Sequence, residues 1–134
     1  MDGHEQTEKE PKVWKARLNR QEQFLLMRAK GHSYAGRYCV VNMLEMPPDG
    51  KGRAAFSISR RYSKLAVERN RARRLFREVY RRLCGRLPEA WVLFIPRHRM
   101  RLAKLDEVLE DASRCMRALL GERFREAGAD DGLE

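Results

Sequence analysis

Apolar residues recur along this chain with helical spacing in three segments and with extended spacing in three others. The first helix is predicted to begin at Asn19 as its N-cap, with Glu22 completing a capping box, and to end near Gly31. Longer helices are predicted over residues 64–83 and 102–120. The core face of the last helix is predicted to consist of Leu102, Leu105, Leu109, Ala112, Met116 and Leu119.

The three extended segments are short and are bounded by turn residues. Residues 38–43 are rich in valine, and residues 91–95 form a continuous apolar run that Pro96 is expected to stop. Between them, residues 47–50 (PPDG) have the composition of a turn, and residues 53–59 alternate in part between small or apolar and polar side chains. Residues 53–59 are therefore predicted to form a second antiparallel strand, which makes the chain a single small α/β domain.

Charge is concentrated in the middle of the chain. The formal net charge is +10, and residues 53–101 contain fifteen Lys or Arg against three Asp or Glu. Residues 102–134 contain five Lys or Arg against nine Asp or Glu. Solubility does not require such segregation, so the middle segment is interpreted as one anion-binding region.

Several other classes of protein do not fit this sequence. Its apolar runs are all shorter than the roughly 18–20 residues of a membrane-spanning helix, and residues 1–15 have mixed charge, unlike a secretory signal. Cys39, Cys84 and Cys115 are odd in number and lack metal-binding spacing. They predict reduced thiols in a cytoplasmic protein with neither a membrane nor a disulfide-linked partner.

The predicted helix over residues 64–83 has two adjoining faces of different chemistry. At about 100° per residue, a basic face within about 140° contains Arg69, Asn70, Arg73, Arg74, Arg77 and Arg81. A separate arc contains Leu65, Ala72, Leu75, Phe76, Val79 and Leu83. Like charges four residues apart repel each other along the basic face. A bound polyanion would relieve this cost, and arginine offers phosphate a planar pair of donors.

The residues do not suggest a catalytic centre within the protein itself. The basic segment contains Glu68, Glu78 and Glu89 as its acidic residues, which are too scattered to hold the metal ions of a nuclease. The three histidines are far apart in sequence and are interpreted as surface residues, and nucleotide-binding or hydrolase motifs are missing. Any chemistry would therefore come from a partner.

The arginine segment and its flanks resemble the bacterial ribonuclease P protein subunit. The signature begins at Ser59, Arg60 and Arg61 and continues through residues 66–78 (AVERNRARRLFRE), where Arg-Asn-Arg is followed by a basic run. Upstream, residues 22–24 (EQF) are similar to a Glu-x-Phe of the family, and residues 91–97 are similar to its last strand. Residues 17 to about 120 can be aligned along the family in order.

The resemblance implies a fold that the pattern alone does not specify. The implied order is α-β-β-β-α-β-α, with an antiparallel or mixed sheet and a first strand around residues 31–35. It also implies a left-handed βαβ crossover into the strand at residues 91–95, although such crossovers are normally right-handed. The RNA-binding domain would cover residues 17–121, between a disordered tail at 1–16 and an acidic tail at 122–134.

In this family the protein assists a catalytic RNA, which uses Mg²⁺ to remove the 5′ leader of precursor tRNA. The resemblance implies that the RNA holds the Mg²⁺ and that the protein binds both the catalytic RNA and precursor tRNA. By matching position, the residues that would hold the single-stranded leader are Phe24, Val40, Asn42, Arg69, Asn70, Arg74 and Arg77. The residues that would contact the catalytic RNA are Arg60, Arg61, Arg71 and Arg73.

Two positions depart from the family pattern, and two other functions fit part of the sequence. Arg28 stands where many members of the family have a second aromatic residue on the helix, and Asn42 stands where some have tyrosine. Stacking on bases is therefore expected to be weaker and the grip on the leader more ionic. A ribosomal or architectural RNA-binding protein with no enzymatic partner would show the same charge distribution. A nuclease that acts without RNA is disfavoured by the scattered carboxylates.

The basic face of the helix at residues 64–83 predicts that RNA binding weakens steeply as the salt concentration rises. The logarithm of the binding constant should fall linearly with the logarithm of salt concentration, because arginines displace condensed cations. Arg73→Ala or Arg74→Ala should reduce the slope by about 0.7–0.9 for each phosphate that the variant no longer binds, with the fold unchanged. Leu75→Ala should instead cost about 2–5 kcal/mol of stability if this side chain is buried. If the arginine variants unfold the protein and Leu75→Ala leaves its stability unchanged, then the assignment of the apolar and basic faces is inverted.

Overall fold

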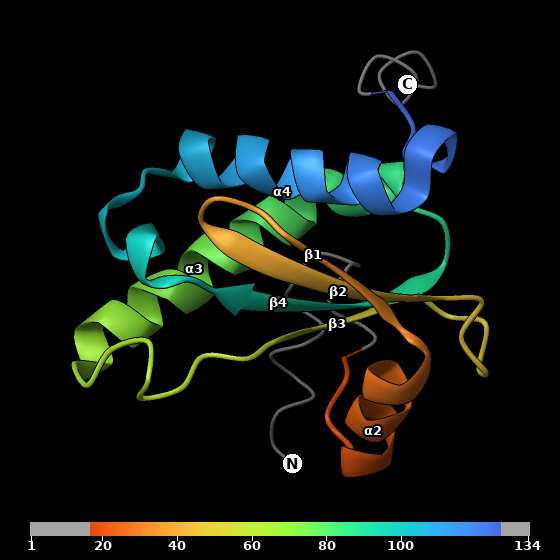
Figure 1. The fold of residues 1–134 in the computed structure, drawn as a ribbon, viewed down its shortest axis with the longest axis horizontal. Helices are drawn as coiled ribbons and strands as arrows, with labels where there is room; N and C mark the ends of the chain where they lie inside the picture. The colour runs from red at the N-terminus through yellow and green to blue at the C-terminus, as the bar shows by residue number, and fades with distance from the viewer. Residues whose placement is uncertain (1–16, 127–134) are drawn as a thin grey trace, which may run out of the picture.

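The computed structural model describes residues 17–126 as one mixed sheet with helices on both faces (Figure 1). The four strands lie in the order β1-β2-β4-β3. In chain order, the elements are α2 (Gln21–Lys30), β1 (His32–Ala35), β2 (Cys39–Glu45), β3 (Arg53–Phe56), α3 (Ala66–Leu83), η2 (Cys84–Arg86), β4 (Ala90–Pro96), η3 (His98–Leu102), α4 (Leu105–Leu120) and η4 (Gly121–Arg123). The order of helices and strands agrees with that implied by the family resemblance, including a first strand near residues 31–35.

The pairing of β3 differs from the prediction for residues 53–59. β3 is parallel to β4, whereas β4 is antiparallel to β2 and separates the two. The expected antiparallel pairing is therefore wrong. The reason is the connection: α3 carries the chain back along the sheet, so the strand after the helix runs parallel to the strand before it. The βαβ crossover is confirmed, and its left hand stays a prediction.

Some predicted ends of elements move by one or more residues. The N-cap of α2 is Arg20 rather than Asn19. Gln23 rather than Glu22 completes the cap, because its Oε1 accepts hydrogen bonds from the backbone N–H groups of Asn19 and Arg20, both at 3.0 Å. Leu102, predicted in the core, is 91% exposed, because residues 98–102 form the 3₁₀ turn η3 and α4 begins after it. No helix in the described range is long and apolar enough to cross a membrane.

The residues at which the buried core begins and ends also differ from the prediction. Leu65 was predicted on the core face of the arginine helix but is 58% exposed, because α3 begins after it. At the other end of the domain, Phe124 is buried, and the guanidinium groups of Arg86 and Arg117 lie 4.1 and 5.3 Å from its ring centre. The packed part of the chain thus extends beyond residue 121.

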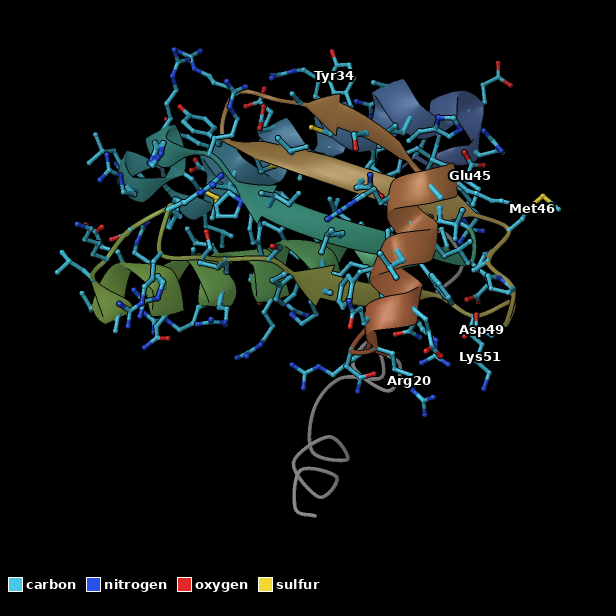
Figure 2. The ribbon with its side chains drawn as sticks, turned by 60° about the horizontal axis from the view of Figure 1, so that its bottom comes forward. Arg20, Tyr34, Glu45, Met46, Asp49 and Lys51 are labelled. Carbon is cyan, nitrogen blue, oxygen red and sulfur yellow. The ribbon has the colours of Figure 1, made fainter. Side chains whose placement is uncertain are left out.

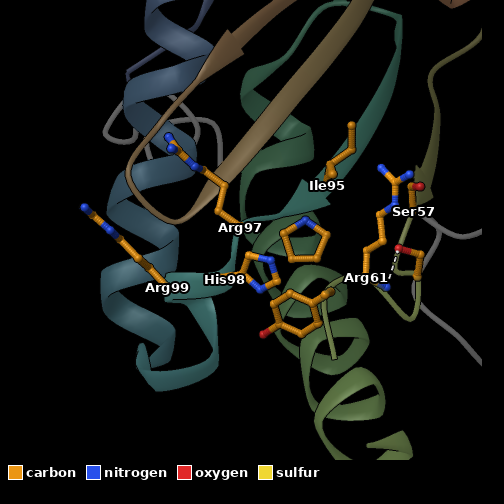
Figure 3. A pocket seen from close by; sticks show the side chains of 9 residues that line it. Ser57, Arg61, Ile95, Arg97, His98 and Arg99 are labelled. Atoms are coloured by element: carbon orange, nitrogen blue, oxygen red, sulfur yellow. Dashed lines mark hydrogen bonds between the residues drawn. The ribbon is translucent and has the colours of Figure 1, made fainter. Parts of the chain in front are cut away.

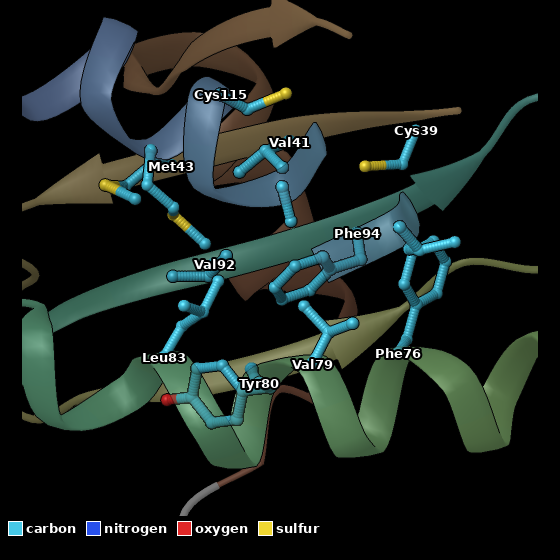
Figure 4. Packing of buried hydrophobic residues seen from close by; sticks show 14 of the residues in the cluster. Cys39, Val41, Met43, Phe76, Val79, Tyr80, Leu83, Val92, Phe94 and Cys115 are labelled. Atoms are coloured by element: carbon cyan, nitrogen blue, oxygen red, sulfur yellow. The ribbon is translucent and has the colours of Figure 1, made fainter. Parts of the chain in front are cut away.

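The main core lies between the sheet and the two long helices (Figure 4). Phe94 of β4 is its centre: the ring centres of Phe76, Phe56 and Tyr80 lie 5.2, 5.8 and 6.1 Å away. The predicted core residues Ala72, Phe76, Val79 and Leu83 are buried here. Burial of this face holds α3 against the sheet and leaves the arginine face outside.

A second, smaller core lies on the opposite face of the sheet, under α2. Met27 of α2 is buried there with Leu18, Leu44 and Trp91, and Phe24 packs at its edge, partly exposed. The chain before α2 is attached to β3, since the Leu18 N–H donates to the carbonyl of the β3 residue at position 54. This small contact fixes the helix over one end of the sheet and leaves the rest of that face uncovered.

A buried carboxylate joins α4 to the turn between β1 and β2. Asp111 is 1% exposed, and its oxygens accept hydrogen bonds from the backbone N–H groups of Arg37, Tyr38 and Cys39 at 2.8, 2.8 and 3.2 Å. A Cβ at Gly36 would lie 2.5 Å from the same carboxylate. The turn therefore needs both the acid and the glycine.

Replacement of this carboxylate should destabilise the fold. Asp111→Ala leaves three inward-facing N–H donors without an acceptor, so the free energy of unfolding should fall by about 2–4 kcal/mol. Glu110→Ala, at the exposed neighbouring position, is the control and should change it by less than about 0.5 kcal/mol. Urea denaturation measures both variants. Equal stability of Asp111→Ala and the wild type would contradict the role of this carboxylate.

Candidate nucleic-acid interface

A groove of about 630 Å³ runs between α2 and the uncovered face of the sheet. Its floor is largely apolar, and its polar side chains come from α2, β1, β2 and the residue after β3. The lining residues are Phe24, Met27, Arg28, Gly31, Ser33, Asn42, Phe56, Ser57, Leu93 and Ile95. An open apolar floor with polar edges can accept flat, unpaired bases.

The structure brings part of the predicted leader site together in this groove. Phe24 and Asn42 both line it, and so does Arg28. Val40 lies two residues from Asn42 on β2, on the same face of the sheet, and pairs in register with the lining residue Ile95. The Asn42 amide donates to Ser33 Oγ at 2.6 Å, so its orientation is set by the neighbouring strand. These residues are distant in sequence but share one surface.

The arginine face of α3 reaches the groove through Arg73. Arg73 lines a smaller cavity of about 370 Å³ together with Phe24 and Arg17, and its guanidinium donates to Asn70 Oδ1 at 3.0 Å. The resemblance placed Arg73 among the contacts to the catalytic RNA, yet it borders the same space as Phe24. Arg74, which was predicted to hold the leader, is exposed on α3 and lines neither of the two cavities.

The other arginines predicted for the leader do not line either cavity. Arg69, half-buried, donates to the Ser63 carbonyl at 3.0 Å, at the start of the helix. Arg77 is exposed farther along α3. They extend the basic surface of the helix on both sides of Arg73 without lining the groove.

Arg71 has a structural role that helical periodicity did not reveal. Its guanidinium donates to the carbonyl of Ala103 and, at 3.5 and 3.4 Å, to those of Met100 and Arg101. The side chain is half-buried against the segment that joins η3 to α4. An arginine in the middle of a basic run therefore holds a loop in place.

The C-terminal end of the arginine helix is partly neutralised by one acid. Glu78 accepts hydrogen bonds from Arg81 at 2.5 Å and Arg82 at 2.7 Å. These bonds lower the pKa of Glu78 to about 2. The positive potential of the helix is thus reduced near its end relative to the half that contains Arg73 and Arg74.

A further basic pocket lies at the end of β4, and Arg61 is the one of its residues that the sequence analysis placed in a site. It has a volume of about 490 Å³ and is lined by Ser57, Ser59, Arg61, Tyr62, Ile95, Pro96, Arg97, His98 and Arg99 (Figure 3). The His98 ring is stacked over the buried Tyr62, with ring centres 6.4 Å apart and planes at 11°. The only signal in the sequence is the basic run after β4. Arg60, predicted beside Arg61 as a contact to the catalytic RNA, is exposed in the loop before α3.

The described residues do not fit a magnesium ion. Among residues 17–126, one group has metal-ligand spacing: Cys39, Asp111 and Cys115, whose ligand atoms lie within 4.8 Å of one another in the core. Mg²⁺ prefers oxygen ligands and retains bound waters. Here the carboxylate oxygens already accept backbone N–H groups. A hydrogen bond with Cys115 and burial both raise the pKa of the Cys39 thiol, which therefore stays protonated.

Comparisons with known proteins all point to one family. The family described as Ribonuclease P matches residues 14–120. A Ribonuclease P protein component from Pseudanabaena sp. (strain PCC 6903) is 37% identical over 73 residues, which are 54% of this chain. The match spans 63% of that relative, slightly less than two thirds of its length.

Two solved structures show the same fold. The RNase P protein from Staphylococcus aureus has a TM-score of 0.70 at 21% identity, and the match covers 81% of this chain and 97% of that chain. The RNase P protein from Thermotoga maritima has a TM-score of 0.63 at 25% identity, and the match covers 78% of this chain and 96% of that chain. The arrangement of the three α-helices of residues 17–126 around a four-stranded mixed sheet is thus shared with these proteins.

Because Arg71 is half-buried against a loop, its replacement should lower the stability of the protein, whereas replacement of an exposed neighbour should not. Arg71→Ala removes the donor for three loop carbonyls, so the free energy of unfolding should fall by about 1–3 kcal/mol. Arg74→Ala, at an exposed position, should change it by less than about 0.5 kcal/mol. Denaturation in urea gives both values. If both variants are as stable as the wild type and weaken RNA binding equally, Arg71 is an RNA contact rather than a loop anchor.

Proposed function

Because the chain belongs to the ribonuclease P family, we propose that it is the protein subunit of a ribonuclease P, acting with a catalytic RNA to remove the 5′ leader of precursor tRNA. The observation that carries this proposal is the groove under α2. Its apolar floor and its arginine edge suit a single strand of RNA and not a duplex, whose bases are already stacked and paired.

Each part of the groove has a distinct task in this proposal. Phe24, partly exposed at the edge of the small core, offers a ring face to a leader base, and stacking is worth about 1–3 kcal/mol per base. Arg28 and Arg73 flank the groove and bind leader phosphates. Asn42, held by Ser33, forms part of the wall at the position where the resemblance implies tyrosine in some members of the family. The contribution of charge relative to stacking is therefore larger here.

The catalytic RNA binds the exposed basic surface formed by α3 and the loop before it. Arg60 and Arg61 form the loop before the helix, and Arg74 is exposed on the helix itself. These side chains offset the repulsion between phosphates when the two RNAs approach each other, so less Mg²⁺ is needed for cleavage. In this proposal the catalytic RNA would hold the Mg²⁺, and the protein positions the substrate. Processing of tRNA places the complex in the cytoplasm.

A second function would use the same basic surface differently. A ribosomal or architectural protein needs positive charge but no groove fitted to a single strand. The groove and its flanking arginines favour the processing function. Purification of the native protein distinguishes the two functions. A ribonuclease P subunit should co-purify with one structured RNA in stoichiometric amount, whereas a ribosomal protein should co-purify with whole ribosomes.

Reconstitution tests the proposed function directly. Protein freed of RNA should leave precursor tRNA intact at every Mg²⁺ concentration, because the described residues do not form a magnesium site. Addition of the cognate catalytic RNA should produce cleavage at the mature 5′ end, and the protein should lower the Mg²⁺ concentration that the RNA needs. Gel analysis of the cleavage products measures both effects. Efficient cleavage by the RNA-free protein would disprove the proposal, and so would an RNA whose Mg²⁺ requirement the protein leaves unchanged.

A further inference from the structure

Two cysteines and an aspartate meet in the main core, between β2 and α4. Cys39 lies on β2, whereas Asp111 and Cys115 lie about one turn apart on α4. All three are buried, and their sulfur and carboxylate ligand atoms lie within 4.8 Å of one another. Figure 4 shows the two thiols pointing toward each other across the core. Cys39 and Asp111 are 72 positions apart in sequence, so the spacing of the cysteines could not reveal this cluster.

The carboxylate of this cluster is held in a fixed orientation by the turn between β1 and β2. Backbone N–H groups of Arg37, Tyr38 and Cys39 donate to its oxygens, and the guanidinium of Arg114 lies 3.3 Å from Oδ1. Carboxylates that bind metal ions are characteristically oriented by such a second set of hydrogen bonds. The Cys39 S–H also donates to Oδ2, so this oxygen faces the thiols.

The distances in the cluster match those around a tetrahedral zinc ion. Zinc lies about 2.3 Å from a thiolate sulfur and about 2.0–2.2 Å from a carboxylate oxygen, so these two ligand atoms are about 3.6 Å apart in a tetrahedral site. Cys39 Sγ and Asp111 Oδ2 are 3.6 Å apart. Asp111 and Cys115 are separated by four positions on one helix, which puts both ligands on the same face. An ion could therefore take the place of the thiol proton with little movement of the chain.

The charge balance of the cluster favours a divalent ion. With both thiols protonated, the carboxylate of Asp111 is the one charge of the cluster. When Zn²⁺ binds, both S–H bonds break, two Zn–S bonds form, and two protons leave for the solvent. Two thiolates, one carboxylate and one divalent cation again sum to one negative charge, so the core gains no charge. A monovalent ion such as Cu⁺ would leave two negative charges there, which burial makes costly.

We propose that Cys39, Asp111 and Cys115 form a zinc site that joins α4 to β2 and to the turn before it. Sulfur ligands favour Zn²⁺ over Mg²⁺ and Ca²⁺, which prefer oxygen. Three protein ligands leave one position of the tetrahedron for a water molecule or the second oxygen of Asp111. Because the three residues meet only in the folded chain, zinc binds the folded state and stabilises it.

The site lies on the opposite face of the sheet from the groove. Successive side chains of a strand point to alternate faces, so Cys39 faces α4 whereas Asn42, three residues along β2, faces the groove. Figure 2 shows Tyr34 of the edge strand β1 near α4, and Arg20 at the start of α2 on the opposite side of the molecule. The inference therefore does not depend on the proposed function, and its test needs no RNA.

Refolding with zinc tests the site. Because the ligands are buried, the full-length chain is unfolded in urea with a phosphine reductant and refolded with or without Zn²⁺. After desalting, wild-type protein should retain one zinc per chain and should unfold at a higher temperature than the zinc-free protein. Cys39→Ala and Cys115→Ala should each weaken zinc binding by at least about a hundredfold, measured by competition with a chelator. Cys84→Ala, at the third, half-buried cysteine, is the matched control and should bind zinc like the wild type.

Refolding with Co²⁺ gives a second measurement that needs no variant. Wild-type protein should show an absorption band from sulfur-to-cobalt charge transfer, and its absence would overturn the proposal even if the alanine variants fail to fold. Wild-type protein that retains no zinc after refolding with the ion would also overturn it. Zinc bound equally well by Cys39→Ala, Cys115→Ala and the wild type would place the ion elsewhere on the chain. Circular dichroism of the zinc-free proteins shows which variants are folded.

Discussion

The packing of Phe76 against Phe94 determines where the arginines of α3 can lie. The two rings are 5.2 Å apart and completely buried between the helix and β4. Once that face is turned inward, the helical period puts Arg74 and Arg77 outside and Arg73 toward the groove. Repulsion among these charges opposes the helix, and burial of its apolar face offsets the repulsion. The binding surface is thus a direct consequence of the core.

The groove exists because α2 is anchored by a small contact and not by a full layer of packing. Met27 and three residues of the sheet and the preceding segment form a cluster at one end, and the remaining apolar surface of that face stays open. Phe24 lies at the border between the two, partly in the cluster and partly in the groove. A larger core under α2 would make the fold more stable and would close the site proposed for the leader.

Residues of one type perform different tasks on a single helix. Arg71 holds the segment after η3, Arg82 shares Glu78 with its neighbour, and Arg73 borders the groove. Their charge is the same, so the difference comes from what lies beside each position in space. Replacing each arginine in turn by alanine would therefore lower stability at some positions and weaken RNA binding at others.

What the sequence by itself determined was local. The spacing of apolar residues predicted the helices and strands and the burial of α3 through Phe76. The spacing of arginines predicted the basic face of that helix, and the arginine signature pointed to the family. The tertiary structure decided the partner of β3, the inward turn of Arg71 and the position of Arg73 beside Phe24. It also placed Asp111 under a turn more than seventy positions away in sequence and exposed Leu102. Periodicity reports the contacts of a residue with its own helix or strand, whereas these features depend on segments that meet only when the chain folds.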